Sequence, residues 1–288
     1  MNVNGIKCVL LDIEGTVCPI SFVKETLFPY AIRALPDVLS TKWDEAEFRS
    51  YRDAFPEEYR SSPATLQAHV EDLTRRDVKV AYLKNLQGFL WEDGYTTGAY
   101  STPLFPDVGP KLKAWRAQGL QVAIYSSGSV FAQKLLFGHI NVDDTLGSKR
   151  QGVDGDAKTR GDSTGEGKAT ITTESATDDP SEKTDNASTI PKPKTEDMTS
   201  IISGWFDTTN AGLKADATSY TTIATALKWQ PSEILFLSDN VHEVDAAIQA
   251  GMNSIVVDRP GNVPLSSEDQ TRLKAIKSLE SITLNLSN

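Results

Sequence analysis

Four short runs of Val, Ile, Leu and Phe, each ending in a polar or acidic residue, constrain the fold of this chain more than any other feature of its sequence. Such nearly continuous apolar runs are typical of strands that are buried on both faces of a parallel sheet. A weaker candidate strand ends at Asp207. The four runs cover residues 6–12, 121–126, 234–239 and 254–258, and the weaker candidate covers residues 204–207.

Helical patterns lie between these runs. Leu112 and Trp115 share one face of the first pattern, and Gly119 and Gly251 follow the first and the last pattern, as is common where helices end. Alternating strands and helices imply βαβ units with right-handed crossovers. The sequence therefore predicts an α/β fold with a doubly wound parallel sheet. The expected helices cover residues 108–118, 130–137, 216–229 and 241–250.

The strand patterns disappear between residues 17 and 102, directly after the first expected strand. Ligands of open α/β sheets bind beyond the carboxyl ends of the strands, so helices inserted at this point would cover the ligand and exclude water. We therefore expect an inserted helical cap domain over residues 17–104 and a discontinuous catalytic core over residues 1–16 and 105–288. The expected cap helices cover residues 24–39, 43–55 and 64–89, separated by Pro36, Pro56 and Pro63.

Residues 147–200 differ in composition from the rest of the core. Their only large aliphatic side chains are Val153, Ile171, Ile190 and Met198, and they include no aromatic residue. Such a segment cannot bury enough apolar area to offset its conformational entropy. We expect a disordered, low-complexity insertion within the core, and an active-site lid is the alternative.

The charge balance argues against several classes of partner. The chain has 29 Lys and Arg against 39 Asp and Glu, a net charge of −10, whereas proteins that bind nucleic acids or membrane surfaces need basic patches. No apolar run approaches the ~20 residues that span a bilayer, and the N-terminus does not resemble a signal peptide. Two cysteines, Cys8 and Cys18, are too few for a disulfide framework. We expect a soluble monomer of the cytoplasm, or of the cytoplasm and the nucleus, that binds neither nucleic acid nor membrane.

Polar side chains follow the first two expected strands. Asp12 and Glu14 come directly after the first strand, close enough in sequence for both carboxylates to reach one small volume. Ser126 and Ser127 follow the second strand and open a helix, and hydroxyl and N–H groups at a helix N-terminus can bind a phosphate. For each pair taken alone, a role in a turn or a helix cap remains open.

Charged residues occupy the corresponding positions later in the chain. Lys214 lies just before an expected helix, where the helix dipole disfavours a cation unless an anion is nearby, and a solvated surface lysine is the alternative. Asp239 ends the third strand and could simply cap the next helix, and Glu243 lies one turn into that helix. Considered together, these residues share one edge of the sheet, where converging carboxylates would repel one another. A bound Mg²⁺ would relieve that repulsion, and the set predicts phosphoryl transfer through a carboxylate nucleophile.

The four motifs in this order, acid-x-acid, hydroxyl, lysine and acid, resemble the haloacid dehalogenase superfamily, in its form with a helical cap after the first motif. Within it, four segments are more closely similar to the enolase-phosphatases, also called acireductone synthases, and Glu14 is specific because most superfamily phosphatases have Asp at that position. The resemblance covers essentially everything outside residues 147–200, an insertion that is unusual for the family. A second departure follows Gly98, where Ala99, Tyr100 and Ser101 replace the Gly-Glu-Leu-Lys type of sequence. The segments are LDIEGTVCPISFVKETLFPYA from Leu11, LQGFLWEDGY from Leu86, YSSGSVFAQKLLFGH from Tyr125 and LFLSDNVHEVDAA from Leu235.

The resemblance implies a two-step reaction of methionine salvage on 2,3-diketo-5-methylthiopentyl-1-phosphate. The diketone is first enolised, and the enol phosphate is then hydrolysed to acireductone and phosphate. The resemblance also implies one Mg²⁺ per subunit. The implied roles are Asp12 as nucleophile and metal ligand, Glu14 as general acid and base and as a metal ligand through its carbonyl, Asp239 as metal ligand, Ser126, Ser127 and Lys214 as substrate-binding residues, and Glu243 as a residue that orients Lys214 or metal-bound water.

Three other functions are compatible with part of this set. A dehalogenase would keep Asp12 but needs no metal, so Glu14 and Asp239 count against it. A phosphatase for another small sugar phosphate would share every core residue, and a non-catalytic binding protein would be expected to have lost part of this set. The three histidines, His69, His139 and His242, have no ligand spacing and are expected at the surface or in packing.

Overall fold

A six-stranded parallel sheet forms the centre of the computed structural model, which describes residues 1–142 and 192–285. The strand order is β6-β3-β2-β7-β8-β9, and every neighbouring pair is parallel. In the register of the central strands, Leu10 lies between Ala123 and Phe236. All five candidate strands are confirmed, and the short edge strand β9 was not predicted. The strands are β2 (Cys8–Leu11), β3 (Gln121–Tyr125), β6 (Gly204–Phe206), β7 (Ile234–Ser238), β8 (Asn253–Val257) and β9 (Ala275–Ile276).

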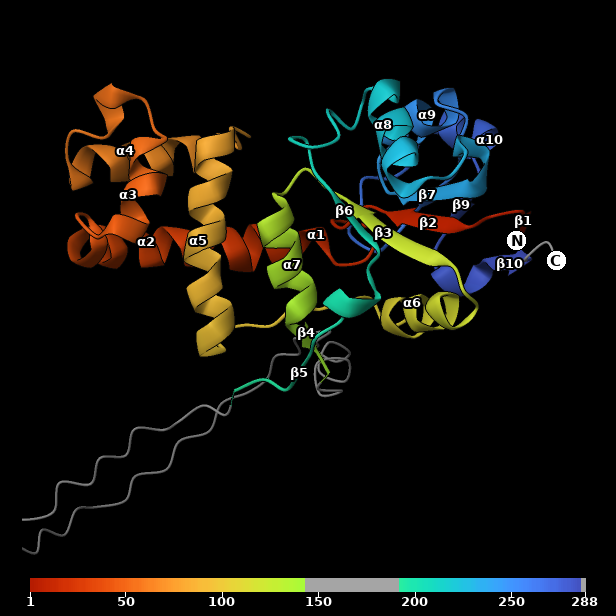
Figure 1. Ribbon diagram of the computed structural model, residues 1–288, viewed down its shortest axis with the longest axis horizontal. Helices are drawn as coiled ribbons and strands as arrows, with labels where there is room; N and C mark the ends of the chain where they lie inside the picture. The colour runs from red at the N-terminus through yellow and green to blue at the C-terminus, as the bar shows by residue number, and fades with distance from the viewer. Residues whose placement is uncertain (143–191, 286–288) are drawn as a thin grey trace, which may run out of the picture. The chain divides into compact units, whose positions relative to one another are not determined.

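Helices cover both faces of this sheet (Figure 1). Successive residues of a strand point to opposite faces, so Val9 and Leu11 of β2 join the apolar cluster that includes α6 and α7, whereas Cys8 and Leu10 join the cluster that includes α8 and α9. This double covering confirms the predicted α/β fold with a doubly wound parallel sheet. The helices of this part are α6 (Val108–Ala117), α7 (Val130–Gly138), α8 (Ala217–Leu227), α9 (Val241–Gln249) and α10 (Ser267–Arg272).

A group of helices connects β2 to α6. Their buried side chains, such as Leu35, Leu66 and Leu86, belong to the same apolar cluster as Val9 and Leu11 of β2. This helical insertion after the first sheet strand has the position that the sequence predicts for a cap. Its elements are α1 (Ile20–Phe22), the π-helix η1 (Val23–Leu27), α2 (Phe28–Lys42), α3 (Ala46–Asp53), the 3₁₀ turn η2 (Glu57–Tyr59), α4 (Pro63–Arg75) and α5 (Ala81–Thr97).

Two details of these helices differ from the sequence-based expectation. The single helix expected over residues 64–89 is two helices, α4 and α5, because the chain leaves the helical region at Asp77, whose φ is +52°. No glycine or proline marks this break in the sequence. Pro36 lies inside α2 rather than between two helices, so the helix continues past a residue that lacks a backbone donor.

The predicted insertion over residues 147–200 falls mainly on residues 143–191, which lie outside the described structure. Its last nine residues are described, and they pack against the core. Thr195 and Glu196 form β5, antiparallel to β4 (Ile140–Asn141), and the backbone N–H of Met198 donates to the carbonyl of Phe137 at 2.9 Å. Met198 is only 1% exposed, so the predicted C-terminal boundary was wrong: one buried methionine anchors this stretch despite its polar composition.

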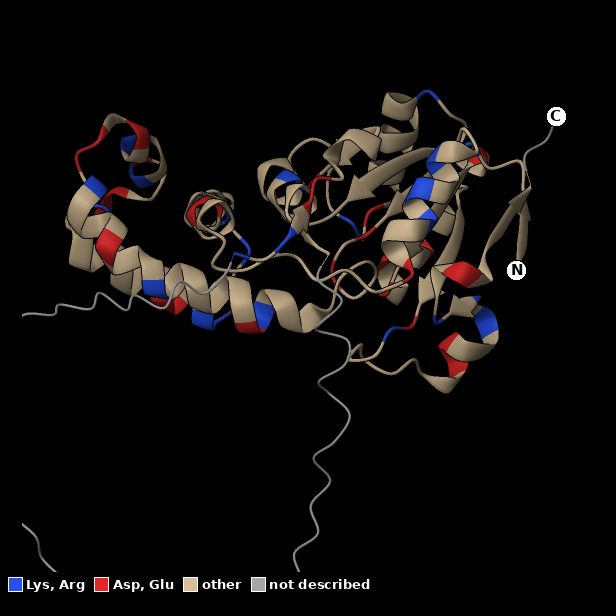
Figure 2. Ribbon diagram, turned by 90° about the horizontal axis from the view of Figure 1, so that it is seen from below, with Lys and Arg blue, Asp and Glu red and all other residues tan. Residues whose placement is uncertain are grey.

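Short elements complete the described chain. Strands β1 and β10 pair in parallel and bring the N-terminus beside residues close to the C-terminus. No helix within residues 1–142 and 192–285 is long and apolar enough to cross a membrane. Figure 2 shows Lys and Arg interspersed with Asp and Glu along the described ribbon. The short elements are β1 (Asn2–Asn4), η4 (Thr199–Ile201), η5 (Pro231–Glu233), η6 (Leu279–Ser281) and β10 (Thr283–Asn285).

Candidate active site

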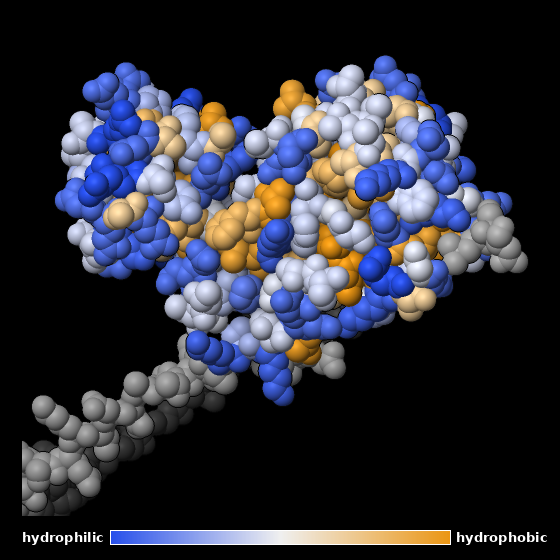
Figure 3. Space-filling model, in the orientation of Figure 1, coloured by the Kyte–Doolittle hydropathy of each residue, from blue (hydrophilic) through white to orange (hydrophobic). Residues whose placement is uncertain are grey.

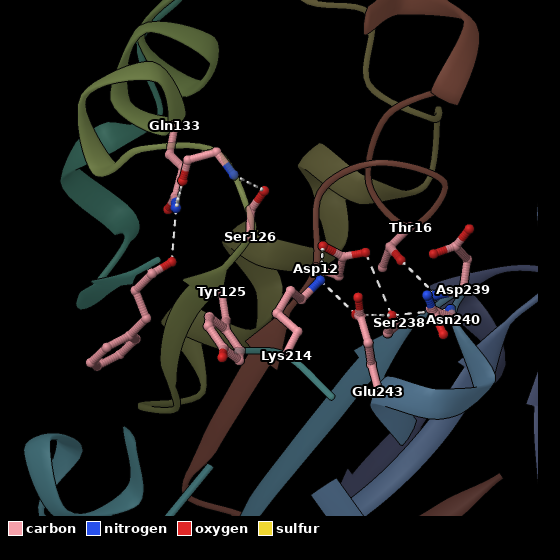
Figure 4. A network of polar contacts seen from close by, with 12 residues as sticks. Asp12, Thr16, Tyr125, Ser126, Gln133, Lys214, Ser238, Asp239, Asn240 and Glu243 are labelled. Carbon is pink, nitrogen blue, oxygen red and sulfur yellow. Dashed lines mark hydrogen bonds and ion pairs between the residues drawn. The ribbon is translucent and has the colours of Figure 1, made fainter. Parts of the chain in front are cut away.

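Asp12 lies directly beyond the C-terminal end of β2, and the residue is 5% exposed. Its Oδ1 accepts a hydrogen bond from Nζ of Lys214 at 2.5 Å, and its Oδ2 lies 3.5 Å from the hydroxyl of Ser238 (Figure 4). Burial raises the pKa of Asp12 to about 6, although the Lys214 ammonium opposes this rise. Asp12 is therefore a buried acid whose ionised form is stabilised mainly by the Lys214 ammonium.

Lys214 bridges two carboxylates. Its Nζ lies 2.5 Å from Oδ1 of Asp12 and 2.5 Å from Oε2 of Glu243, and the residue is 9% exposed. Burial alone would lower the pKa of Lys214, but the charges of the two carboxylates outweigh burial and raise it. The backbone carbonyl of Lys214 accepts a hydrogen bond from the hydroxyl of Tyr220 at 2.7 Å, which fixes the segment before α8. Lys214 is thus a permanent cation held at the strand ends.

Glu243 lies in the first turn of α9, and Ser238 at the end of β7 holds it in place. The Ser238 hydroxyl is fully buried and donates to Oε2 of Glu243 at 2.8 Å. Its Oγ also accepts a hydrogen bond from the backbone N–H of Asn240, the residue that caps α9. Glu243 therefore contacts Lys214 directly, which is the arrangement that the first of its two implied roles requires.

The loop that follows Asp12 passes close to Asp239. Gly15 has a φ of +73°, and a Cβ atom at this position would collide with Oδ2 of Asp239. The hydroxyl of Thr16 accepts a hydrogen bond from the backbone N–H of Asp239 at 3.0 Å. Both the positive φ and the close approach require glycine at position 15.

Glu14 and Asp239 add to the negative charge around Asp12. Burial, followed by repulsion from Asp12, raises the pKa of Glu14. The same two causes raise the pKa of Asp239 to about 7. The ionised forms of these acids therefore destabilise one another, which a bound cation would relieve.

The oxygen atoms around this site suit Mg²⁺. Carboxylate oxygens are available from Asp12 and Asp239, and the backbone carbonyl of Glu14 accepts no hydrogen bond from another described residue. Among the residues that the structure describes, no three His, Cys, Asp or Glu side chains are arranged to enclose a metal ion. Two carboxylates with one carbonyl still fit Mg²⁺, because this ion keeps several waters and is usually bound by only one or two protein carboxylates.

Ser126 and Ser127 lie at the end of β3, next to β2. The Ser126 side chain is buried, and its Oγ accepts a hydrogen bond from the backbone N–H of Gly128 at 3.2 Å. The carbonyl of Ser127 accepts a hydrogen bond from Nζ of Lys84, on helix α5, at 2.7 Å. Neither serine is hydrogen-bonded to Asp12 or Lys214 in the described structure, but both line a cavity that Glu14 also lines.

Two residues outside the predicted set hold the Ser126–Ser127 turn. Asp207, at the end of β6, accepts hydrogen bonds from the backbone N–H groups of Val130, Thr209 and Asn210. The side-chain amide of Gln133 donates to the carbonyls of Gly128 and Phe206, both at 2.8 Å. Asp207 could have been selected from the sequence, because it ends a candidate strand as Asp12 and Asp239 do. No pattern in the sequence distinguishes Gln133.

An apolar cavity adjoins Glu14, Ser126 and Ser127. Its walls come from the helices between β2 and α6 and from α7, and Figure 3 shows hydrophobic side chains gathered over α5 and α7. The indole N–H of Trp91 donates to the carbonyl of Leu27 at 2.8 Å, which ties α5 to η1 within the wall. The cavity can therefore receive an apolar group attached to a phosphate held at the strand ends. Its apolar lining includes Ile20, Val23, Leu27, Leu83, Trp91 and Leu136.

We predict that the metal-free protein becomes less stable as the pH rises from about 5 to about 8. The pKa values of Asp12 and Asp239 are raised to about 6 and about 7, so between pH 4 and 7 the native state binds protons that the unfolded chain has released. Stability is then lost as these groups ionise. Urea unfolding in the presence of a chelator measures this change. The pH dependence is expected to be smaller in Asp239→Asn, and a midpoint that rises over this range would contradict the prediction.

Comparisons with known proteins agree with this geometry. The family model described as haloacid dehalogenase-like hydrolase matches residues 6–182. Enolase-phosphatase E1 of Pyricularia oryzae is 47% identical over 280 residues, which cover 97% of this chain and 99% of the relative. Enolase-phosphatase E1 of Podospora anserina is 48% identical over 278 residues, which cover 96% of this chain and 97% of the relative.

A solved structure extends the likeness to the fold. The UTR4 protein of Saccharomyces cerevisiae is 33% identical, with a TM-score of 0.71 and coverage of 96% of this chain and 99% of that chain. Identity of this extent over nearly the whole length shows a shared family and not the fold alone. The chain therefore belongs to the enolase-phosphatase family of haloacid dehalogenase-like hydrolases, and it is a phosphatase.

Proposed function

We propose that this protein is a Mg²⁺-dependent enolase-phosphatase of methionine salvage. Its substrate would be 2,3-diketo-5-methylthiopentyl-1-phosphate, and its products acireductone and phosphate. The observation that carries the proposal is the buried cluster of Asp12, Lys214 and Glu243, which lies beside Glu14 and an apolar cavity. The helices over residues 17–104 would act as the cap that closes this site.

In the phosphatase step, Asp12 would act as the nucleophile. An Oδ atom of Asp12 forms a bond to phosphorus while the bond from phosphorus to the ester oxygen breaks, and Glu14 gives a proton to the departing oxygen. Water then attacks the aspartyl-phosphate, Glu14 takes a proton from that water, and the bond between Asp12 and phosphorus breaks. Burial and the nearby charge of Asp12 raise the pKa of Glu14, which favours its role as the group that gives the proton in the first step.

Other side chains would bind the phosphoryl group and the metal. Lys214, Ser126 and Ser127 would contact the phosphoryl oxygens, and the lysine would balance the charge that develops in the transition state. Asp12, Asp239 and the carbonyl of Glu14 would hold Mg²⁺. When bound, this ion supplies positive charge against the phosphoryl oxygens and polarises a substrate carbonyl.

Enolisation requires that a proton leave C1 of the diketone. Two groups that line the cavity can accept it. Glu14 is one, because it lines the same cavity as Ser126 and Ser127, which would bind the phosphoryl group. Lys84 is the other, because burial and then the nearby charge of Lys79 lower its pKa and so increase its neutral fraction.

The apolar cavity would receive the methylthio end of the substrate. Ala132 of α7 lines this cavity, and a larger side chain there would fill part of it. We predict that Ala132→Leu raises KM for the diketone about tenfold, since overpacking an apolar pocket costs about 1–3 kcal/mol. Hydrolysis of a short phosphoester without the tail should change much less. Steady-state kinetics on both substrates measure the difference.

The matched control for this variant is Ala226→Leu, which makes the same change at an exposed position of α8. It should leave both KM values unchanged. An equal loss on the short and the tailed substrate in Ala132→Leu would show that the cavity does not select the tail.

A comparison of substrates tests the proposed function. The expected kcat/KM for the diketone exceeds that for common sugar phosphates by at least about 100-fold, because only the diketone fills the apolar cavity. Strong turnover of common sugar phosphates with none of the diketone would favour a general phosphatase. Absence of turnover on every phosphoester would favour a binding protein.

A further inference from the structure

The loop that follows β8 contacts the loop that carries Glu14. Nε of Arg259 donates to the carbonyl of Thr16 at 3.1 Å. The side-chain amide of Asn262 donates to the carbonyl of Gly15 at 2.9 Å and to the carbonyl of Val257, at the end of β8, at 3.1 Å. Side chains from one loop therefore hold two successive carbonyls of another, more than two hundred residues away in sequence.

Arg259 is itself fixed in position. Its guanidinium is buried, with the residue 5% exposed, and Nη1 donates to both carboxylate oxygens of Asp107 at 2.9 and 3.0 Å. The same nitrogen donates to the carbonyl of Lys277 at 3.0 Å, and the guanidinium lies 4.6 Å from the ring centroid of Phe105. A charge paired and stacked in this way has little freedom to move, so the carbonyl of Thr16 meets a rigid donor.

Asn262 and Arg259 fix the two peptides that follow Gly15, and the backbone N–H of Gly15 donates to the carbonyl of Cys18 at 2.8 Å. The carbonyl of Ile13 accepts hydrogen bonds from three backbone N–H groups of its own loop, and the carbonyls of Gly15 and Thr16 accept from Asn262 and Arg259. The carbonyl of Glu14 accepts none from the described residues and so stays available to an ion. The hydroxyl of Thr16 extends the network to the backbone N–H of Asp239.

We propose that Asn262 and Arg259 are positioning residues for the metal and phosphoryl site. They hold the Glu14 carbonyl and Asp239 in the relative placement that one ion and one phosphoryl group require. They do so through Gly15 and Thr16, and neither Asn262 nor Arg259 would itself contact the ion or the phosphoryl group. This inference rests on the proposed function, since it assigns these residues a part in that same site. Residues that orient metal ligands in this way commonly affect metal affinity or activity by about 10- to 100-fold.

The test uses Asn262→Ala and Arg259→Lys in the full chain. Asn262→Ala removes both side-chain hydrogen bonds, and Arg259→Lys keeps the charge but cannot contact Asp107 and Thr16 together. The control is Arg272→Lys, which alters a similar pair with Asp245 at an exposed position at the end of α10. Three quantities are measured: kcat and KM for phosphate release, the Mg²⁺ concentration that gives half-maximal velocity, and the rise in unfolding temperature on adding Mg²⁺ alone.

In both variants we expect kcat to fall about 10- to 100-fold while KM changes less than about threefold. The half-maximal Mg²⁺ concentration should rise, and the stabilisation by Mg²⁺ alone should shrink. Arg272→Lys should match the wild type in all three. If Arg259→Lys does not fold, the measurements on Asn262→Ala alone test the inference. Asn262 lies on a partly exposed loop, so its replacement by alanine should leave the fold intact.

A lower unfolding temperature with an unchanged response to Mg²⁺ and an unchanged kcat would overturn the inference, because it would show a merely structural role. The proposed function is judged on the wild type in the same experiment. Suppose that the wild type releases phosphate and is stabilised by Mg²⁺, and that Asn262→Ala matches it in all three quantities. That result would exclude the positioning role and leave the proposed function standing. A wild type that neither releases phosphate nor is stabilised by Mg²⁺ would exclude the proposed function and the positioning role together.

Discussion

Asp12→Asn is expected to lower kcat/KM for phosphate release by at least about 10⁴-fold, because an amide cannot form the aspartyl-phosphate. The fold should persist. An asparagine oxygen can still accept the hydrogen bond from Lys214, and removing one of several buried negative charges reduces repulsion on Asp239 and Glu14. The unfolding midpoint of the metal-free variant should therefore not fall. Phosphate release and urea unfolding measure the two effects on the same preparation.

Asp216→Asn is the matched control for this variant. It makes the same acid-to-amide change close by in sequence to Lys214, at the N-cap of α8, where asparagine caps a helix as well as aspartate does. Its kcat/KM and stability should stay near those of the wild type. Phosphate release by Asp12→Asn within about tenfold of the wild type would exclude Asp12 as the nucleophile.

Lys214→Met is expected to lower the free energy of unfolding by about 3–5 kcal/mol near pH 8 in the absence of metal, because it leaves the buried carboxylates of Asp12 and Glu243 without a counter-charge. The loss should shrink towards pH 5, where Asp12 binds a proton. Catalysis should fall about 10³-fold as well, since the transition state loses a cation. Denaturant unfolding at both pH values gives the stability difference.

The control here is Lys113→Met, which removes a lysine paired with Glu196 at 2.7 Å on the surface, where the lysine side chain is 51% exposed. Exposed pairs of this kind contribute less than about 1 kcal/mol. Equal costs for the two substitutions would show that Lys214 does not balance buried charge.

Much of the fold and several site residues could be predicted because their signals are local. A strand buried on both faces must be apolar throughout, so the acid that ends it, such as Asp12 or Asp239, stands out in the sequence. Strands of a parallel sheet end at a common edge, which is why residues so far apart as Asp12, Lys214 and Glu243 could be expected together. In the structure, Lys214 contacts both Asp12 and Glu243.

Other features have no local signal. The break between α4 and α5 occurs at Asp77, where no glycine or proline marks it. Backbone hydrogen bonds from Asp77 to the carbonyl of Thr74 and from Val78 to the carbonyl of Leu73 close the end of α4 there. Residues 192–200 are anchored by one buried side chain, Met198. The composition of the whole polar segment does not reveal the effect of a single apolar residue. Asn262 and Arg259 act on Gly15 and Thr16 through side-chain contacts across the sheet edge, and no spacing in the sequence encodes such a contact.

The most direct test of the account follows two signals from one reaction. The diketone phosphate is mixed with the wild-type protein, and the absorbance of the enol and the release of phosphate are recorded together, with Mg²⁺ and with a chelator. We expect a transient rise in enol absorbance that precedes phosphate, and the loss of phosphate release without Mg²⁺. Phosphate release with no transient enol, or at the same rate in the chelator, would contradict the account.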